Sequence, residues 1–192
     1  MRFEVAVWPD VLADLDAMAA VHAERAEQWW QAGREAALAL EPAARRAALA
    51  TLREERDRRR AAGEHFDTRS SIVAYHLRAE LDRRGWRGRT WPPVPRGEVT
   101  MPGRRWGVAN DGTLSATFAV YVPDDDGELL RRATWKVSAP AVRRLQQIAA
   151  MGPRLPRPVR QERDRLRGQV VTTADVIRAA AVAAVDSWRS PA

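Results

Sequence analysis

Two stretches of this chain concentrate arginine, the side chain best suited to bind phosphate groups. Residues 83–106 contain seven arginines and one acidic residue, and residues 154–167 contain six arginines and two acidic residues. Local excesses of positive charge are typical of proteins that bind polyanions such as nucleic acids. The chemistry that the sequence offers most clearly is therefore electrostatic contact with a phosphate backbone.

The first of these stretches interleaves its arginines with tryptophans. In one interpretation, the arginines follow a phosphate backbone while the tryptophans stack on unpaired bases or enter a groove. In the other, the stretch is an ordered linker whose tryptophans pack between two halves of the chain. The candidate phosphate-binding residues here are Arg87, Arg89, Arg104 and Arg105, and the tryptophans are Trp86, Trp91 and Trp106.

Patterns that would indicate catalysis or metal binding are weak. The three histidines, His22, His65 and His76, have no spacing typical of a metal site or a catalytic triad. Residues 124–127 read Asp-Asp-Asp-Gly, which favours an acidic turn over a metal site. The sequence has no cysteine, and therefore no disulfide or thiolate ligand. We expect no enzyme activity, no metal and no cofactor.

The composition is that of a globular protein without a membrane segment. The 192 residues carry a formal net charge of +7, and 45% of them are hydrophobic. No window approaches roughly 18 uninterrupted apolar residues, and the N-terminus lacks a secretory pattern, so we expect a cytoplasmic location. High-GC coding would also enrich arginine, and Lys136 is the only lysine. The placement of the charge is therefore more informative than its sum.

A pattern near the start of the chain recurs near its end. Residues 5–20 read VAVWPDVLADLDAMAA and residues 135–150 read WKVSAPAVRRLQQIAA. Each copy changes from a spacing of two to a spacing of three or four, which predicts a strand followed by a helix. A second pair, TRSSIVAYHL from Thr68 and TTADVIRAAA from Thr172, has a helix N-cap signal in both copies. The sequence thus predicts two strand–helix–helix units with insertions of unequal length.

Periodicity and the positions of Pro and Gly give the remaining elements of an α+β, mainly helical fold. Residues 114–122 alternate, and we expect them to form a β-hairpin with residues 129–138. We expect three segments: an N-terminal strand and helical domain at 1–84, a linker or arm at 85–107, and a hairpin with helices at 108–192. The expected strand at residues 2–8 is followed by helices that begin near Pro9, Glu41, Ser70, Pro140 and Thr172.

The C-terminal copy resembles the ribbon-helix-helix family of DNA-binding proteins. Its parts are a ribbon strand at residues 133–138, a first helix at 140–150 and a second helix that opens at 171–178. Residues 152–170 interrupt the resemblance where the family has a short turn. In this family, paired antiparallel ribbons enter the major groove, and the second helix offers its N-terminal amides to phosphate. The resemblance therefore assigns to DNA the residues Arg132, Thr134, Lys136, Thr172 and Thr173.

These observations predict a protein that binds double-stranded DNA sequence-specifically, as a repressor, a plasmid or phage maintenance factor, or an accessory factor. The protein could act as a homodimer, or the two ribbons of one chain could pair as a pseudo-dimer. The alternative is a helical adaptor or inhibitor from a mobile element. Such a protein would bind a partner protein through its N-terminal helices, where Trp29 and Trp30 lie. We expect no membrane partner.

Overall fold

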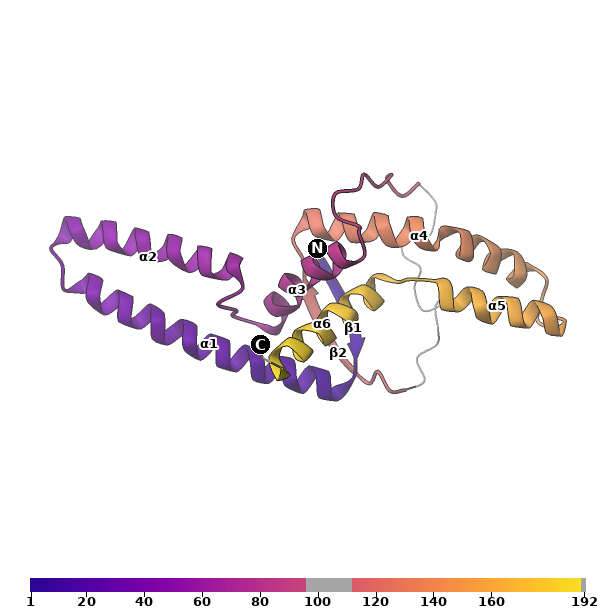
Figure 1. Cartoon of the computed structure of the whole chain (residues 1–192), viewed down its shortest axis with the longest axis horizontal. Coiled ribbons are helices and arrows are strands. Elements are labelled where there is room, and N and C mark those ends of the chain that lie inside the picture. Colours follow the sequence, from indigo (N-terminus) through magenta and orange to yellow (C-terminus); the bar gives the residue numbers. More distant parts are fainter. Residues whose placement is uncertain (96–111, 191–192) are drawn as a thin grey trace.

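The computed structural model describes residues 1–95 and 112–190 and contains two strands and six helices in this part of the chain. The fold is α+β and mainly helical, as the sequence predicted. Figure 1 shows the small sheet at the centre, with helices around it and projecting to both sides. In chain order the elements are β1 (Arg2–Val7), α1 (Pro9–Leu38), α2 (Pro42–Ala62), α3 (Arg69–Arg83), β2 (Ala116–Tyr121), α4 (Asp124–Ala150), α5 (Arg157–Gln169) and α6 (Thr173–Arg189).

The order of elements repeats once along the chain. Each half has a six-residue strand, then a long helix, a second helix and a final helix that begins with a capping box. In that box the side chains of Thr68 and Ser71 cap α3, and those of Thr172 and Asp175 cap α6. The element order thus contains a strand followed by helices in each half, with α2 and α5 as the inserted helices, but the second unit does not have the bounds that the sequence predicted.

The strand of the second half does not lie at residues 133–138, where the internal repeat predicted it. Residues 116–121 form β2, which pairs with β1 in an antiparallel ribbon from Arg2 opposite Tyr121 to Val7 opposite Ala116. Residues 133–138, expected to be the ribbon strand, lie in the middle of α4. The two halves therefore pair their strands with each other, as in the predicted pseudo-dimer, but through a different segment.

The expected hairpin between residues 114–122 and 129–138 is wrong because residues 124–150 form the single helix α4. The three aspartates do not turn the chain. They lie in the first turn of α4, where negative charge interacts favourably with the helix dipole. Pro140, expected to start a helix, lies inside α4 on an exposed face. Because Pro140 has no N–H, it cannot donate the helical hydrogen bond to the carbonyl of Lys136.

The main hydrophobic core lies between the ribbon and the helices and draws on both halves of the chain. Phe3, Val5 and Val7 point into it from β1, and Phe118 and Val120 from β2. Helices α3 and α6 pack against each other, and each also packs against the strand of the opposite half, α3 on β2 and α6 on β1. The two halves therefore interlock, and neither strand is buried by its own half alone.

Two helical hairpins extend from this core in opposite directions (Figure 1). We call residues 19–64, formed by most of α1 and all of α2, the first arm. Residues 136–169, formed by the second half of α4 and by α5, are the second arm. The second arm has its own small hydrophobic cluster, to which Val142, Leu145, Ile148 and Leu166 contribute. In the first arm, by contrast, no residue of α2 is buried.

In the part of the chain that the structure describes, no single helix is long and apolar enough to cross a bilayer. Helices α5 and α6 meet the length and composition criteria only as a pair, across a bend of 53°.

Candidate nucleic-acid interface

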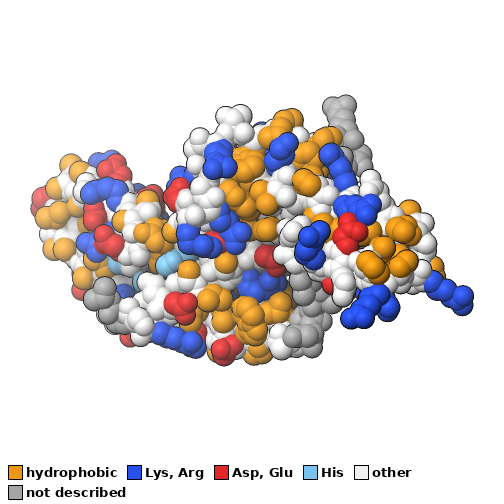
Figure 2. Space-filling model, turned by 45° about the vertical axis from the view of Figure 1, so that its right-hand side comes forward, with side chains coloured by type: hydrophobic (Ala, Val, Ile, Leu, Met, Phe, Trp, Pro, Cys, Tyr) orange, Lys and Arg blue, Asp and Glu red, His pale blue; other side chains and the backbone are white. Residues whose placement is uncertain are grey.

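The positive charge of the chain is concentrated on the second arm. Residues 136–169 contain nine basic and two acidic residues, a formal excess of seven positive charges, which equals the net charge of the whole chain. The other residues of the sequence therefore balance to zero. Figure 2 shows several Lys and Arg side chains projecting from the end of the molecule that the second arm forms. The structure thus gathers the charge excess on one projecting element.

The two helices of the second arm are held together by contacts that use few of its arginines. Its apolar cluster joins α4 to α5, with Leu155 and Val159 packed against it from the far end. Across the same interface Arg144 donates from Nε and Nη2 to the carboxylate of Glu162, at 2.8 and 3.0 Å. This hydrogen-bonded pair raises the pKa of Arg144 and lowers the pKa of Glu162.

Most of the remaining cations on the second arm are available to an external anion. Among the described residues, none forms an ion pair with the exposed cations Lys136, Arg154, Arg157 and Arg160 or with the half-buried Arg167. Arg163 is paired only with its neighbour Asp164, at 2.9 Å. Helix α5 has 13 residues and therefore extends about 20 Å. This length matches a stretch of duplex that carries about twelve phosphates.

The three residues expected to read bases lie on helix α4 and do not share one face. Successive alternate residues of a strand point the same way, whereas on a helix they are separated by about 200°. Arg132 donates from Nε to Glu128 at 2.8 Å, and Lys136 is exposed. Thr134 is fully buried, and its hydroxyl donates to the carbonyl of Leu130 at 2.7 Å. The prediction of a base-reading strand at these residues is wrong because the segment is helical.

The structure uses Thr172 and Thr173 to begin α6. The Thr172 hydroxyl accepts the amide N–H of Asp175 at 3.1 Å, and the Asp175 carboxylate accepts the amide N–H of Thr172 at 2.8 Å. Thr173 is 7% exposed. A carboxylate beside these amides repels phosphate, so the geometry explains Thr172 as the cap of α6 and Thr173 as a buried residue of its first turn.

The tryptophans of the first basic stretch that the structure describes pack inside the protein. Trp86 is 6% exposed, and the indole N–H of Trp91 donates to the carbonyl of Trp86 at 2.9 Å. Arg87 is paired with Asp82 at 3.0 Å, whereas Arg89 is exposed and has no ion-pair partner among the described residues. The packing interpretation therefore holds for Trp86 and Trp91. Of the same stretch, Arg104, Arg105 and Trp106 lie outside the described residues.

The outer face of the β1–β2 ribbon is open to solvent. Arg2 and Glu4 on β1, and Thr117 and Tyr121 on β2, are exposed on the face opposite the core. Arg2 and Glu4 pair with each other at 2.8 Å, which leaves the ribbon with little net charge. This face therefore offers hydrogen-bonding groups and an aromatic ring, but little electrostatic attraction for a polyanion.

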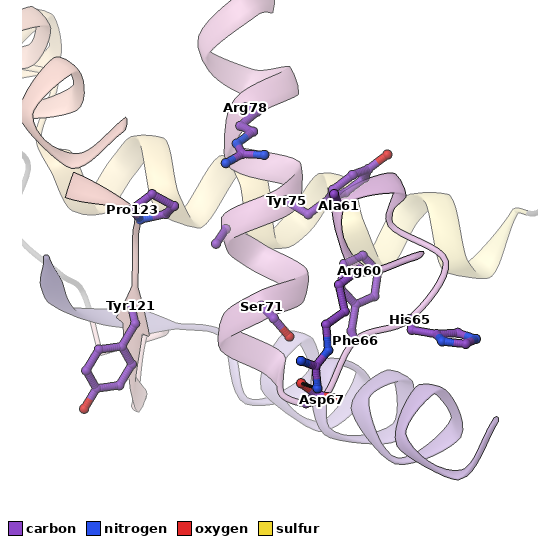
Figure 3. Close-up of a pocket in the computed structure, with 11 residues that line it drawn as sticks. Arg60, Ala61, His65, Phe66, Asp67, Ser71, Tyr75, Arg78, Tyr121 and Pro123 are labelled. Carbon is purple, nitrogen blue, oxygen red and sulfur yellow. Dashed lines mark ion pairs between the residues drawn. The ribbon is translucent and has the colours of Figure 1, made fainter. Parts of the chain in front are cut away.

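A cavity of about 360 Å³ lies between the end of α2, helix α3 and the end of β2 (Figure 3). Its two arginines are neutralised at short range, Arg60 by Asp67 at 2.6 Å and Arg78 by Asp126 at 3.0 Å. Figure 3 shows the ring of His65 directed away from Arg78. The Ser71 hydroxyl in the lining donates to the carbonyl of Thr68 at 2.6 Å, and no group of three or more potential metal ligands occurs in residues 1–95 and 112–190.

The sequence shows the arginines of α5 as a basic stretch, but the sequence-based prediction of a DNA interface includes none of them. The reason is that residues 152–170 interrupt the family resemblance and therefore had the character of an insertion. Two features of the sequence could have identified these arginines. Pro158 marks the start of a helix, since it lies in the first turn of α5, and the residues of that helix carry an excess of positive charge.

Comparison with known proteins adds no relative of this chain: no family model, no curated protein and no solved structure matches it.

Proposed function

We propose that this protein binds double-stranded DNA in the cytoplasm and that the second arm provides the contacts to phosphate. The observation that carries this proposal is the placement of a charge excess equal to that of the whole chain on one projecting hairpin with its own apolar cluster. Arginines without internal partners can exchange water and counterions for phosphate, and the released counterions favour binding. If Lys136, Arg154, Arg157, Arg160 and Arg167 each engage one phosphate, log K falls with log salt at a slope of about −4.5.

The second arm suits a duplex better than a single strand. Proteins that bind single strands combine positive charge with exposed aromatic rings on which the bases stack. Residues 136–169 contain no Phe, Trp or Tyr, and the adjacent Trp135 is 8% exposed. A straight helix with arginines on its surface instead matches the regular phosphate spacing of a duplex.

Sequence preference is assigned in this proposal to the outer face of the β1–β2 ribbon. A two-stranded antiparallel ribbon fits the major groove, and Arg2, Thr117 and Tyr121 can donate hydrogen bonds to base edges. The strand–helix–helix order in both halves supports the resemblance to the ribbon-helix-helix family, with β1 and β2 as the paired ribbons. Roles in repression, in plasmid or phage maintenance, or beside a DNA-processing enzyme all fit such a protein.

The experiment that tests this function is selection from random-sequence duplex DNA across a salt series. We expect retention at low salt, a steep loss of affinity as salt rises, and an enriched motif among the fragments retained at about 150 mM. Retention without a motif would reject sequence-specific reading by the ribbon and leave phosphate binding by the second arm. Absence of retention at every salt concentration would reject DNA binding.

A second candidate function, an adaptor that binds another protein through the first arm, is favoured by apolar side chains at the turn of that arm. Leu38 and Leu40 are 47% and 42% exposed there. Trp29 and Trp30, in contrast, are covered by the guanidinium groups of Arg59 and Arg56, each 4.9 Å from the ring centre. An adaptor should therefore lose its partner when Leu38 and Leu40 are changed to Glu, whereas DNA binding should be unaffected.

A further inference from the structure

The end of the second arm, residues 151–158, presents apolar side chains to solvent between arginines. Met151 is 56% exposed, and Pro153, Pro156 and Pro158 are also exposed. The cations that border these residues are Arg154, Arg157 and Arg160, and no acidic residue occurs between positions 151 and 161. Figure 2 shows apolar side chains on this part of the molecule, with several Lys and Arg side chains and some acidic atoms near them.

This apolar end is also conformationally restrained. Gly152 has a φ of +90°, in the left-handed region that glycine adopts most readily, and so ends α4 sharply. The proline rings fix φ at three further positions. Leu155 and Val159 anchor the segment to the cluster of the second arm. The restrained backbone reduces the entropy lost when the end of the arm enters a binding site.

The apolar end of the second arm is bordered mainly by arginines, and it therefore fits a target with a negatively charged rim and an apolar interior. In duplex DNA the phosphates form the rim of the minor groove, and the stacked bases form the interior. Proteins that bend DNA from this groove insert apolar side chains, Met and Pro among them, between two base pairs. The arginines beside the wedge can contact the flanking phosphates.

We propose that the end of the second arm inserts Met151, supported by Pro153, between base pairs from the minor groove and bends the DNA. This inference rests on the proposed binding of double-stranded DNA and extends it, because phosphate contact alone requires neither unstacking nor bending. The apolar end would then distinguish deformable steps such as TA from stiff ones without any hydrogen bond to a base.

The test uses the full chain and a duplex of about 30 base pairs with a fluorophore at each end and 2-aminopurine at a central TA step. We expect the wild-type protein to increase energy transfer between the ends and to increase 2-aminopurine fluorescence. The double variant Met151→Ser with Pro153→Ser should keep the salt slope of binding and lose most of both signals. Leu38 at the end of the first arm is 47% exposed, similar to Met151. Leu38→Ser therefore serves as the matched control and should behave as wild type.

The possible results separate this inference from the proposed function. DNA binding with neither signal, or with both signals intact in the double variant, would overturn the wedge while leaving phosphate binding in place. No DNA binding at any salt concentration would overturn both. Phosphatidylcholine vesicles that contain phosphatidylserine provide a second probe. Vesicle binding that depends on Met151, without DNA binding, would assign the apolar end to an anionic membrane surface and overturn the wedge.

Discussion

The two arms of this protein contain the same number of basic residues and use them differently. Each arm has nine, but the first arm also has eight acidic residues, whereas the second has two. In the first arm the arginines hold the hairpin together. Arg59, for example, covers the ring of Trp29 and pairs with Glu55 at 3.0 Å. In the second arm an apolar cluster holds the two helices together. Most cations of this arm therefore form no ion pair within the described part of the protein.

This difference shows how one side-chain type can serve structure or function. An arginine that lies on a tryptophan and beside a carboxylate is already satisfied, and moving it to an external phosphate would cost those contacts. An arginine on a hairpin that Leu and Ile stabilise loses nothing of this kind. The apolar cluster of the second arm therefore leaves its cations free to bind a polyanion.

The largest expected effect follows from removing that cluster. Leu145, 3% exposed, packs between α4 and α5, and we expect Leu145→Ala to lower the free energy of unfolding by about 2–5 kcal/mol. Leu52→Ala, at a half-buried position of α2, should cost clearly less. Denaturant unfolding of both variants measures the comparison. Equal losses would show that the first arm depends on apolar packing as much as the second.

A smaller effect is expected from freeing one more cation on the second arm. Glu162→Gln removes the partner of Arg144 and adds one positive charge to the arm, so DNA affinity at low salt should rise several-fold. Glu55→Gln, which removes the shared partner of Arg58 and Arg59 on the first arm, is the matched control and should leave affinity unchanged. Fluorescence anisotropy with a labelled duplex measures both. Equal gains in the two variants would show that affinity follows total charge and not its position.

Removing a first-arm arginine should affect stability and not binding. Arg59→Gln keeps a polar side chain but abolishes the cation–π contact with Trp29 and the ion pair with Glu55. We expect a loss of about 0.5–1 kcal/mol in the free energy of unfolding. DNA affinity should stay within experimental error. A change in affinity larger than the change in stability would place the first arm in the DNA interface.

The smallest effect concerns pH and is confined to the region where the first arm meets the core. Burial lowers the pKa of His22, as do the nearby Arg25 and His65, while a hydrogen bond to the Glu64 carbonyl partly opposes this. Burial also lowers the pKa of His76. Because the folded-state pKa values lie below the ordinary value of 6.5, the unfolded chain binds protons more readily. Stability should therefore be constant above pH 6.5 and decrease as the pH falls below it.

Hydrogen exchange at pH 7 and pH 5, corrected for the intrinsic rates, measures this effect. Loss of protection should concentrate at α1, α3 and the segment between α2 and α3, because no histidine lies in the second arm. His22→Phe should reduce the pH dependence of unfolding. A uniform loss of protection in both arms would contradict the assignment to these histidines.

Much of the fold was predictable because several signals were local. Thr68 and Thr172 marked helix starts by their own side-chain chemistry, and β1 showed the period-two alternation of a half-buried strand. The hairpin prediction failed at α4 because Trp135 and Val137 alternate with polar residues as a strand would. The burial pattern that identifies a helix there, from Leu130 to Ile148, became apparent only over a longer window.

The candidate interface was only partly predictable for a different reason. The basic composition of residues 154–167 was evident, but composition cannot show which arginines are paired. Pairing depends on contacts between distant parts of the chain, such as Arg144 with Glu162 and Arg78 with Asp126. For the same reason, the burial of Thr134 required knowledge of the helix that contains it.

The central claim, that the second arm binds duplex DNA, is tested most directly by neutralising three arginines on each arm in turn. One variant carries Arg154→Gln, Arg157→Gln and Arg160→Gln, and the matched control carries Arg25→Gln, Arg34→Gln and Arg53→Gln. Both lose three charges at exposed positions. We predict that the slope of log K against log salt becomes less steep by about 2.7 in the first variant and stays at its wild-type value in the control. Equal changes in the two variants, or no change in the first, would contradict the account.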